Sequence, residues 1–338
     1  MSLTVDLAPT MVHQSQHTVQ QSQHTVLLLT TTISKSTAVI SCSAMAILYV
    51  AILYSPTLIL RLPPPTSFKS FLLRRFVCAA ISSAVSLIAA AFLLPVNWEA
   101  IEIFGAFGIR LDHTQQWQAV IYPLFLTSLM YAGSLILKAL LVLDALSYEG
   151  QRLSMSDYIK GAFVTFVDWM SSMVSNVGAW RNYVVAPVTE ELVFRACMIP
   201  LLLCGGFSTY AVIFLCPVFF SLAHLNHFLE LYTQQKLSFL RASSIVGFQL
   251  GYTVVFGSYA SFLFVRTGNL ISPLIAHIFC NFMGLPAMFS RRTGIVTLAF
   301  VAGVLGFLWL LVPLTSPHLY NYRTDNCKCW HRYCDWTL

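Results

Sequence analysis

Residues 294–314 read GIVTLAFVAGVLGFLWLLVPL, an apolar run without a single charged side chain. The hydrocarbon core of a bilayer is about 30 Å thick, and an α-helix needs about 20 apolar residues to cross it. A helix also satisfies its own backbone hydrogen bonds, which lipid cannot do. This stretch therefore predicts a transmembrane helix.

The composition of the whole chain extends that prediction. Of the 338 residues, 57% are hydrophobic and only 9% are charged, whereas an ordinary soluble domain has roughly 25% charged residues. So few charges cannot cover the surface of a soluble protein of this size. The net charge of +6 is too small to favour binding to nucleic acid and is typical of basic cytosolic loops in a membrane protein.

Apolar runs of spanning length recur along the chain. They predict an all-α fold, a polytopic integral membrane bundle of about eight transmembrane helices. The expected spans are Thr37–Tyr54, Phe76–Leu94, Ala119–Leu143, Tyr183–Leu203, Thr209–His227, Ser244–Val265, Leu270–Met288 and Gly294–Leu314.

Three regions of different composition follow from these spans. Residues 1–36 are polar and carry the hexad QSQHTV twice, so we expect a disordered segment. Residues 37–314 form the membrane domain. Residues 315–338 form a tail whose cysteines, Cys327, Cys329 and Cys334, lack the paired CxxC spacing of a structural zinc site.

Basic residues between the first two spans predict the orientation. Arg61, Lys69, Arg74 and Arg75 lie there without an acidic residue among them, and such loops stay in the cytosol. Alternation of sides then places the start of the fourth span and the end of the fifth at the cytosolic face. The same scheme places both tails in the lumen.

The fourth span carries charges, which are costly in a membrane helix and usually functional. Its beginning reads APVTEELVFR, residues 186–195. Glu190 and Glu191 lie about 100° apart around a helix, so the two carboxylates cannot share one face. Glu191 and Arg195 have the i, i+4 spacing of an ion pair. Glu190 is then free to point into the bundle, unless the pair of acids only caps a helix N-terminus.

Two other spans carry histidines. The fifth ends in FFSLAH, with Phe220 four residues before His224, and the seventh contains HIFCN, in which His277 and Asn281 share one face. A single histidine within a membrane is more often a packing residue than a catalyst. Together with Glu190, however, these side chains on three spans predict one cavity that opens to the cytosol.

This set of groups is sufficient for peptide-bond hydrolysis. A carboxylate and a histidine can bind and deprotonate water, and a second histidine with an asparagine amide can donate to an oxyanion. The sequence contains no HExxH motif, no G-x-S-G motif and no intramembrane aspartate pair. Cys280 lies on another face than His277 and Asn281, which argues against a cysteine nucleophile.

Three motifs now resemble a known family. Glu190-Glu191-xxx-Arg195, Phe220-xxx-His224 and His277-xxx-Asn281 are similar, in order, to the EExxxR, FxxxH and HxxxN motifs of the CPBP family of type II CaaX proteases and bacteriocin-processing proteins. The stretch APVTEELVFRACM is most similar to its eukaryotic CaaX prenyl endopeptidases. The resemblance covers about residues 40 to 315.

The resemblance implies a glutamate-type intramembrane protease in the endoplasmic reticulum membrane, with its active site open to the cytosol. Such enzymes remove the last three residues from farnesylated or geranylgeranylated C-a-a-X proteins, including Ras-type GTPases. Glu190 and His224 would activate water, and His277 and Asn281 would form the oxyanion hole. Glu191, Arg195 and Phe220 would support them. No metal or other cofactor is implied; the expected partners are the prenylated substrates and the lipid bilayer.

Two alternatives stay open on the sequence. Glu190, His224 and His277 have the side chains of a zinc-dependent hydrolase. The second alternative is a non-catalytic scaffold protein of the same family. Such a protein would be expected to lack Glu190 or His224, and both are present.

Overall fold

The computed structural model describes residues 33–96, 100–109, 116–148, 164, 168, 171–287 and 294–320, and all regular secondary structure in these ranges is helical. The predicted N-terminal segment and Cys-containing tail lie almost entirely outside them. The longer helices are α2 (Lys35–Ala51), α4 (Phe68–Leu93), α6 (Gln116–Met130), α7 (Ala132–Tyr148), α12 (Thr209–Ala223), α14 (Phe239–Thr267), α15 (Ile271–Met283) and α16 (Gly294–Leu314).

Within the described ranges, five helices are long and apolar enough to cross a membrane, and six if one bent pair counts as a single span. This confirms a polytopic helical membrane protein. The five are Lys35–Thr57, Phe68–Leu93, Thr209–Thr233, Phe239–Thr267 and Gly294–Leu314. The bent pair is α6 with α7, which meet at 76° within the predicted third span. With the bent pair counted as one span, two of the eight predicted spans are missing from this number.

The predicted fourth and seventh spans are the ones that fall outside this group. The fourth is helical throughout, but Glu190, Glu191 and Arg195 make it too polar for a simple span. In the seventh, α15 has only 13 residues, about 20 Å of helix, which is shorter than the hydrocarbon core. Both spans carry predicted site residues, Glu190, Glu191 and Arg195 in the fourth and His277 and Asn281 in the seventh, so function and membrane insertion make opposing demands on the same segments.

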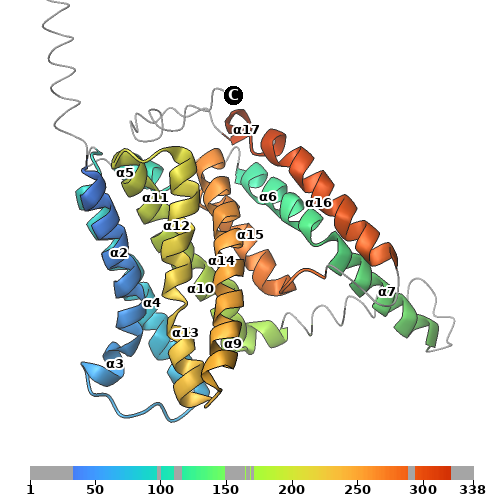
Figure 1. The fold of residues 1–338 in the computed structure, drawn as a ribbon, viewed down its shortest axis with the longest axis horizontal. Coiled ribbons are helices and arrows are strands. Elements are labelled where there is room, and N and C mark those ends of the chain that lie inside the picture. The colour runs from blue at the N-terminus through green and yellow to red at the C-terminus, as the bar shows by residue number, and fades with distance from the viewer. Residues whose placement is uncertain are drawn as a thin grey trace, which may run out of the picture.

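The helices form two groups (Figure 1). In one, α2, α4, α12 and α14 stand upright around a central helix, and α12 packs against α14. In the other, α16 lies along α6 and α7 as a slanted arm, and α15 lies between the two groups and contacts both α6 and α14. The short helices α3 (Ser55–Leu58) and α13 (Asn226–Leu229) lie at one end of the upright group.

The central helix runs without a break from residue 177 to residue 204. It comprises α9 (Val177–Trp180), α10 (Ala186–Glu191) and α11 (Met198–Cys204), which two π-helical stretches, Arg181–Val185 and Leu192–Cys197, join. Every residue from 193 to 204 is buried, so this helix is the core of the upright group. π-Turns are rare and are found mostly at functional sites, and here they flank the two glutamates.

Candidate active site

Glu190 and Glu191 end α10 and point in different directions, as their positions on the helix predict. Glu191 is fully buried, whereas the Glu190 side chain keeps 16% of its surface exposed. The two carboxylates therefore have different environments: Glu191 faces the protein interior, and Glu190 faces a pocket.

Glu191 forms the ion pair predicted from its spacing. Arg195 Nη1 donates to Glu191 Oε1 at 3.0 Å, and both side chains have no exposed surface. The Arg195 guanidinium also lies over the Phe220 ring, at 4.6 Å from its centroid. Gly257 of α14 leaves room for this group, because a Cβ there would lie 3.3 Å from Arg195 Nη2 and 2.9 Å from the Pro217 Cβ.

His277 gives Glu191 a second partner that the sequence did not predict. His277 Nδ1 lies 2.7 Å from Glu191 Oε1. Glu191 is paired with Arg195, and its carboxylate oxygen accepts, so Nδ1 carries a hydrogen. The other ring nitrogen, Nε2, lies 3.7 Å from Glu190 Oε2. The imidazole thus connects the two glutamates, and the Phe256 ring, 5.2 Å away edge-on, holds its plane.

His224 is held in one tautomer by its own helix. It follows α12 directly, and its Nδ1 lies 2.9 Å from the carbonyl oxygen of Phe220. A carbonyl can only accept, so Nδ1 donates, and Nε2 of the neutral ring keeps its lone pair. That nitrogen is the one a general base needs. Phe220 packs edge-on against the imidazole, with the ring centroids 4.8 Å apart. The same phenyl ring contacts the Arg195 guanidinium, so it lies between His224 and the ion pair.

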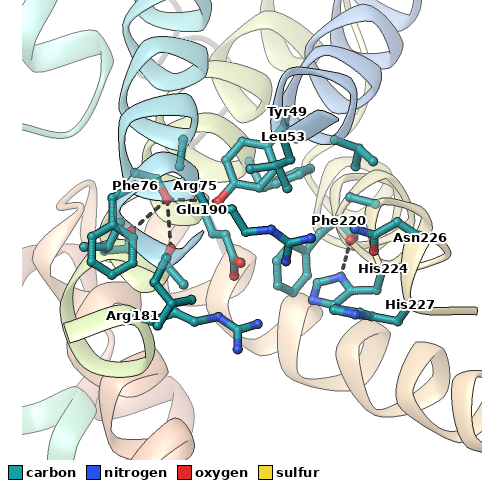
Figure 2. Close-up of a pocket in the computed structure, with 18 residues that line it drawn as sticks. Tyr49, Leu53, Arg75, Phe76, Arg181, Glu190, Phe220, His224, Asn226 and His227 are labelled. Atoms are coloured by element: carbon teal, nitrogen blue, oxygen red, sulfur yellow. Dashed lines mark hydrogen bonds between the residues drawn. The ribbon is translucent and has the colours of Figure 1, made fainter. Parts of the chain in front are cut away.

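Glu190 and His224 line one pocket of about 110 Å³ (Figure 2). The other lining residues that carry polar groups are Tyr49, Arg75, Arg181, Thr189, Asn226 and His227. In Figure 2 the Glu190 carboxylate and the His224 imidazole approach this pocket from different helices. A water between a carboxylate and an imidazole can lose a proton to either group.

The structure does not bring all four predicted catalytic residues to this pocket. Neither His277 nor Asn281 belongs to its lining; His277 approaches it through Glu190. The Asn281 side chain is exposed, and its Nδ2 donates to the backbone carbonyl of Asn182 at 2.9 Å. This bond ties α15 to the π-helical stretch in front of α10.

Sequence reasoning missed several lining residues. Tyr49 of α2 donates its hydroxyl hydrogen to Thr189 Oγ1 at 2.9 Å, since that hydroxyl itself donates to the Val185 carbonyl at 2.7 Å. His227 lies one turn after His224, with the two ring centroids 5.8 Å apart. Thr189 and His227 are sequence neighbours of predicted residues, which is a signal that could have found them. Nothing in the sequence pairs Tyr49 with Thr189.

An apolar groove of about 650 Å³ adjoins the pocket. It lies between α2 and the end of α12 with α13, and its lining includes Ile47, Tyr54, Phe219, Leu222 and Leu229. The pocket and the groove share three lining residues, Val50, Ala223 and Asn226. A long apolar group in the groove can therefore reach the glutamate and the histidine.

A zinc-dependent hydrolase would need three or more metal-ligating side chains close together. In the ranges that the structure describes, no three His, Cys, Asp or Glu side chains gather closely enough to hold a metal ion.

Comparison with known proteins gives consistent matches. Residues 173–283 match the family described as Type II CAAX prenyl endopeptidase Rce1-like; this segment contains Glu190, His224, His277 and Asn281. The chain is 57% identical over 296 residues to CAAX prenyl protease 2 of Arabidopsis thaliana, covering 87% of this chain and 94% of that protein. It is 33% identical over 294 residues to CAAX prenyl protease 2 of Homo sapiens, covering 83% and 82%.

No solved structure matches the chain. The sequence matches nevertheless extend over most of the membrane domain and agree with the resemblance in the three motifs. The chain therefore belongs to the CAAX prenyl protease 2 family of type II CaaX prenyl endopeptidases.

Proposed function

We propose that this protein removes the C-terminal aaX tripeptide from prenylated C-a-a-X proteins, Ras-type GTPases among them. The names of its relatives support this activity. The structural observation that carries the proposal is the pocket of Glu190 and His224, which continues into a large apolar groove. A prenylated cysteine has its lipid on one side and the scissile bond directly after it, and this arrangement offers a place for each.

The chemistry proposed is direct attack by water. Glu190 and His224 bind a water molecule in the pocket and take one of its protons, and the hydroxide attacks the carbonyl carbon of the prenylated cysteine. The C–N bond then breaks, and the same groups return the proton to the leaving amine. The tautomer of His224 supports its part as a base, because Nε2 is the nitrogen without a hydrogen.

His277 and Asn281 are proposed to stabilise the oxyanion. The contacts of His277 support this role: Glu191 accepts from Nδ1 and orients the ring, and Nε2, which lies on the side of Glu190, donates when the ring carries hydrogens on both nitrogens. An oriented donor of this kind costs no reorganisation when charge develops. Asn281 has two amide hydrogens and uses one on Asn182, so the second remains for the substrate.

The groove supports a prenylated substrate in preference to a bare peptide. Isoprenoid chains gain about 0.8 kcal/mol for each CH₂ that leaves water. The lining is mostly apolar and lies on a face where Ile47 and Leu222 are largely exposed, so a lipid chain can enter from the bilayer.

The location proposed is the endoplasmic reticulum membrane, with the pocket open to the cytosol. The basic loop between the first two spans supports this orientation. Helix α3, which precedes this loop, lies at the same end of the molecule as α13 (Figure 1). The pocket is lined near that end by Leu53, Arg75 and Asn226.

The test is cleavage of a farnesylated C-a-a-X peptide by the purified protein in lipid nanodiscs. We expect release of the intact tripeptide, detected by mass spectrometry, with little cleavage of the same peptide without its lipid. Release from the wild type but not from Glu190→Gln supports the proposal. Absence of tripeptide from the wild type contradicts it. Activity that disappears with a chelator and returns with Zn²⁺ would favour the zinc-hydrolase alternative.

A further inference from the structure

Two arginines of the pocket have no anionic partner in the part of the chain that the structure describes. Arg75 lies on α4, and Arg181 begins the π-helical stretch in front of α10; both line the pocket with Glu190 (Figure 2). Neither forms an ion pair with a carboxylate of the described residues. The Arg75 guanidinium lies 4.6 Å above the Phe71 ring, and its Nε is buried without a hydrogen-bond partner in the same part of the chain.

The pocket consequently has more positive than negative charge. Glu190 is the single carboxylate among its lining residues, against the two guanidinium groups. Glu191 cannot balance them, because it is buried elsewhere and already paired with Arg195. Arg75 is half-buried, where an unpaired charge is costly, whereas Arg181 is exposed and can turn toward an anion. One additional anion would balance the pocket.

The proposed substrate brings such an anion. The tripeptide that leaves ends in a free carboxylate, three residues after the scissile bond. An extended chain advances about 3.3–3.6 Å per residue, so this carboxylate lies about 10 Å from the reacting carbonyl. Arg181 precedes Glu190 by nine positions on one continuous helix, which is about 13 Å at 1.5 Å per residue. A long arginine side chain covers the difference.

The direction of the substrate is consistent with this distance. In Figure 2, Arg181 lies on one side of the Glu190 carboxylate, and Asn226, which the pocket shares with the groove, lies on the other. A lipid in the groove places the cysteine beside Glu190 and His224. The tripeptide then extends from there toward Arg181.

We propose that Arg75 and Arg181 form a subsite that binds the C-terminal carboxylate of the substrate. This inference rests on the proposed function and adds a specificity rule to it. Guanidinium groups suit a carboxylate because they donate charge-assisted, often bidentate, hydrogen bonds. A receptor at a fixed distance from the reacting groups selects a bond three residues from a free C-terminus, so the enzyme measures the length of the tail.

The test compares two farnesylated C-a-a-X peptides, one with a free C-terminal carboxylate and one with a C-terminal amide. For the wild type we expect a KM about 10- to 100-fold lower for the acid, the range of hydrogen bonds to charged groups. In Arg75→Gln and Arg181→Gln, the KM for the amide divided by the KM for the acid should fall toward one. Arg181→Lys should keep part of the preference. Lys69→Gln, an exposed α4 residue outside the lining, is the matched control and should keep all of it.

Binding of both peptides to Glu190→Gln, measured by fluorescence anisotropy, separates the two proposals. Preference for the acid that the arginine substitutions abolish supports the subsite, even if no cleavage is found and the proposed function fails. Equal affinity of the two peptides overturns the subsite, even if both are cleaved. An acid preference that survives both arginine substitutions also overturns it.

Discussion

Glu191 Oε1 accepts hydrogen bonds from both Arg195 and His277, at 3.0 and 2.7 Å, and so joins the central helix to α15. Glu191 thereby orients a proposed oxyanion donor while remaining outside the pocket. The network is not complete, because Glu191 Oε2 and Arg195 Nε and Nη2 have no partner among the described residues. The charges of Glu191 and Arg195 can stay buried because each lies next to the other.

Removal of one member of this pair should destabilise the protein strongly. Glu191→Gln and Arg195→Gln each leave a buried charge without its partner, at a cost of about 3–5 kcal/mol. The double variant removes both charges and should recover part of the loss, although His277 then loses its acceptor. Thermal unfolding of the four proteins in detergent gives the coupling energy. Strictly additive losses would mean that Glu191 and Arg195 are not energetically coupled.

Activity should distinguish Glu190 from Glu191. Glu190→Gln and His224→Ala should each abolish cleavage of a farnesylated peptide, because each removes a group that takes the proton of water. Neither should unfold the protein, since Glu190 is partly exposed and the imidazole of His224, among the described residues, forms a hydrogen bond only with its own helix. The measurement is kcat/KM together with the thermal midpoint. Substantial cleavage by either purified variant would exclude the assigned roles.

Local sequence patterns predicted the local features correctly. The spacing of Glu191 and Arg195 gave their ion pair, and the composition gave a helical membrane protein. The contact of His277 with Glu191 joins residues 86 positions apart. No helical period encodes such a contact, because it depends on how α15 packs against α10.

The span count and the pocket were less predictable for related reasons. Hydropathy detected α15 as a full span, but Gly284, with φ of +71°, ends the helix after Met283. The sequence also placed Asn281 in the cavity because it shares a face with His277. One helical turn is about 5.4 Å, enough for His277 to reach Glu190 while Asn281 reaches the Asn182 carbonyl.

Obstruction of the groove should weaken binding of the lipid without affecting the chemistry. Ile47→Trp fills a lining position on α2 that is 68% exposed. We expect a rise in KM of about tenfold with kcat nearly unchanged, and a larger rise for geranylgeranylated than for farnesylated peptide, since the longer chain needs more room. Ile40→Trp, on the same helix and 66% exposed but outside the groove, is the control. Equal effects of both substitutions would show that the groove does not hold the lipid.

Asn281 offers the sharpest test of the oxyanion hole, because its present hydrogen bond suggests a second, purely structural role. The bond to the Asn182 carbonyl holds α15 against the segment before α10. If the second amide hydrogen serves the oxyanion, Asn281→Ala should lower kcat by about 10²–10³-fold and leave KM nearly constant, since such a donor acts only in the transition state.

A matched control comes from the acceptor of that bond. Asn182→Ala keeps the backbone carbonyl to which Asn281 donates, and the Asn182 side chain is exposed, so its kcat and thermal midpoint should stay close to those of the wild type. Asn281→Asp keeps the size of the side chain but has no donor when ionised, and its kcat should fall as far as that of Asn281→Ala. A normal kcat with a lower thermal midpoint in both Asn281 variants would reduce this residue to a tie between two helices and leave His277 as the remaining proposed donor.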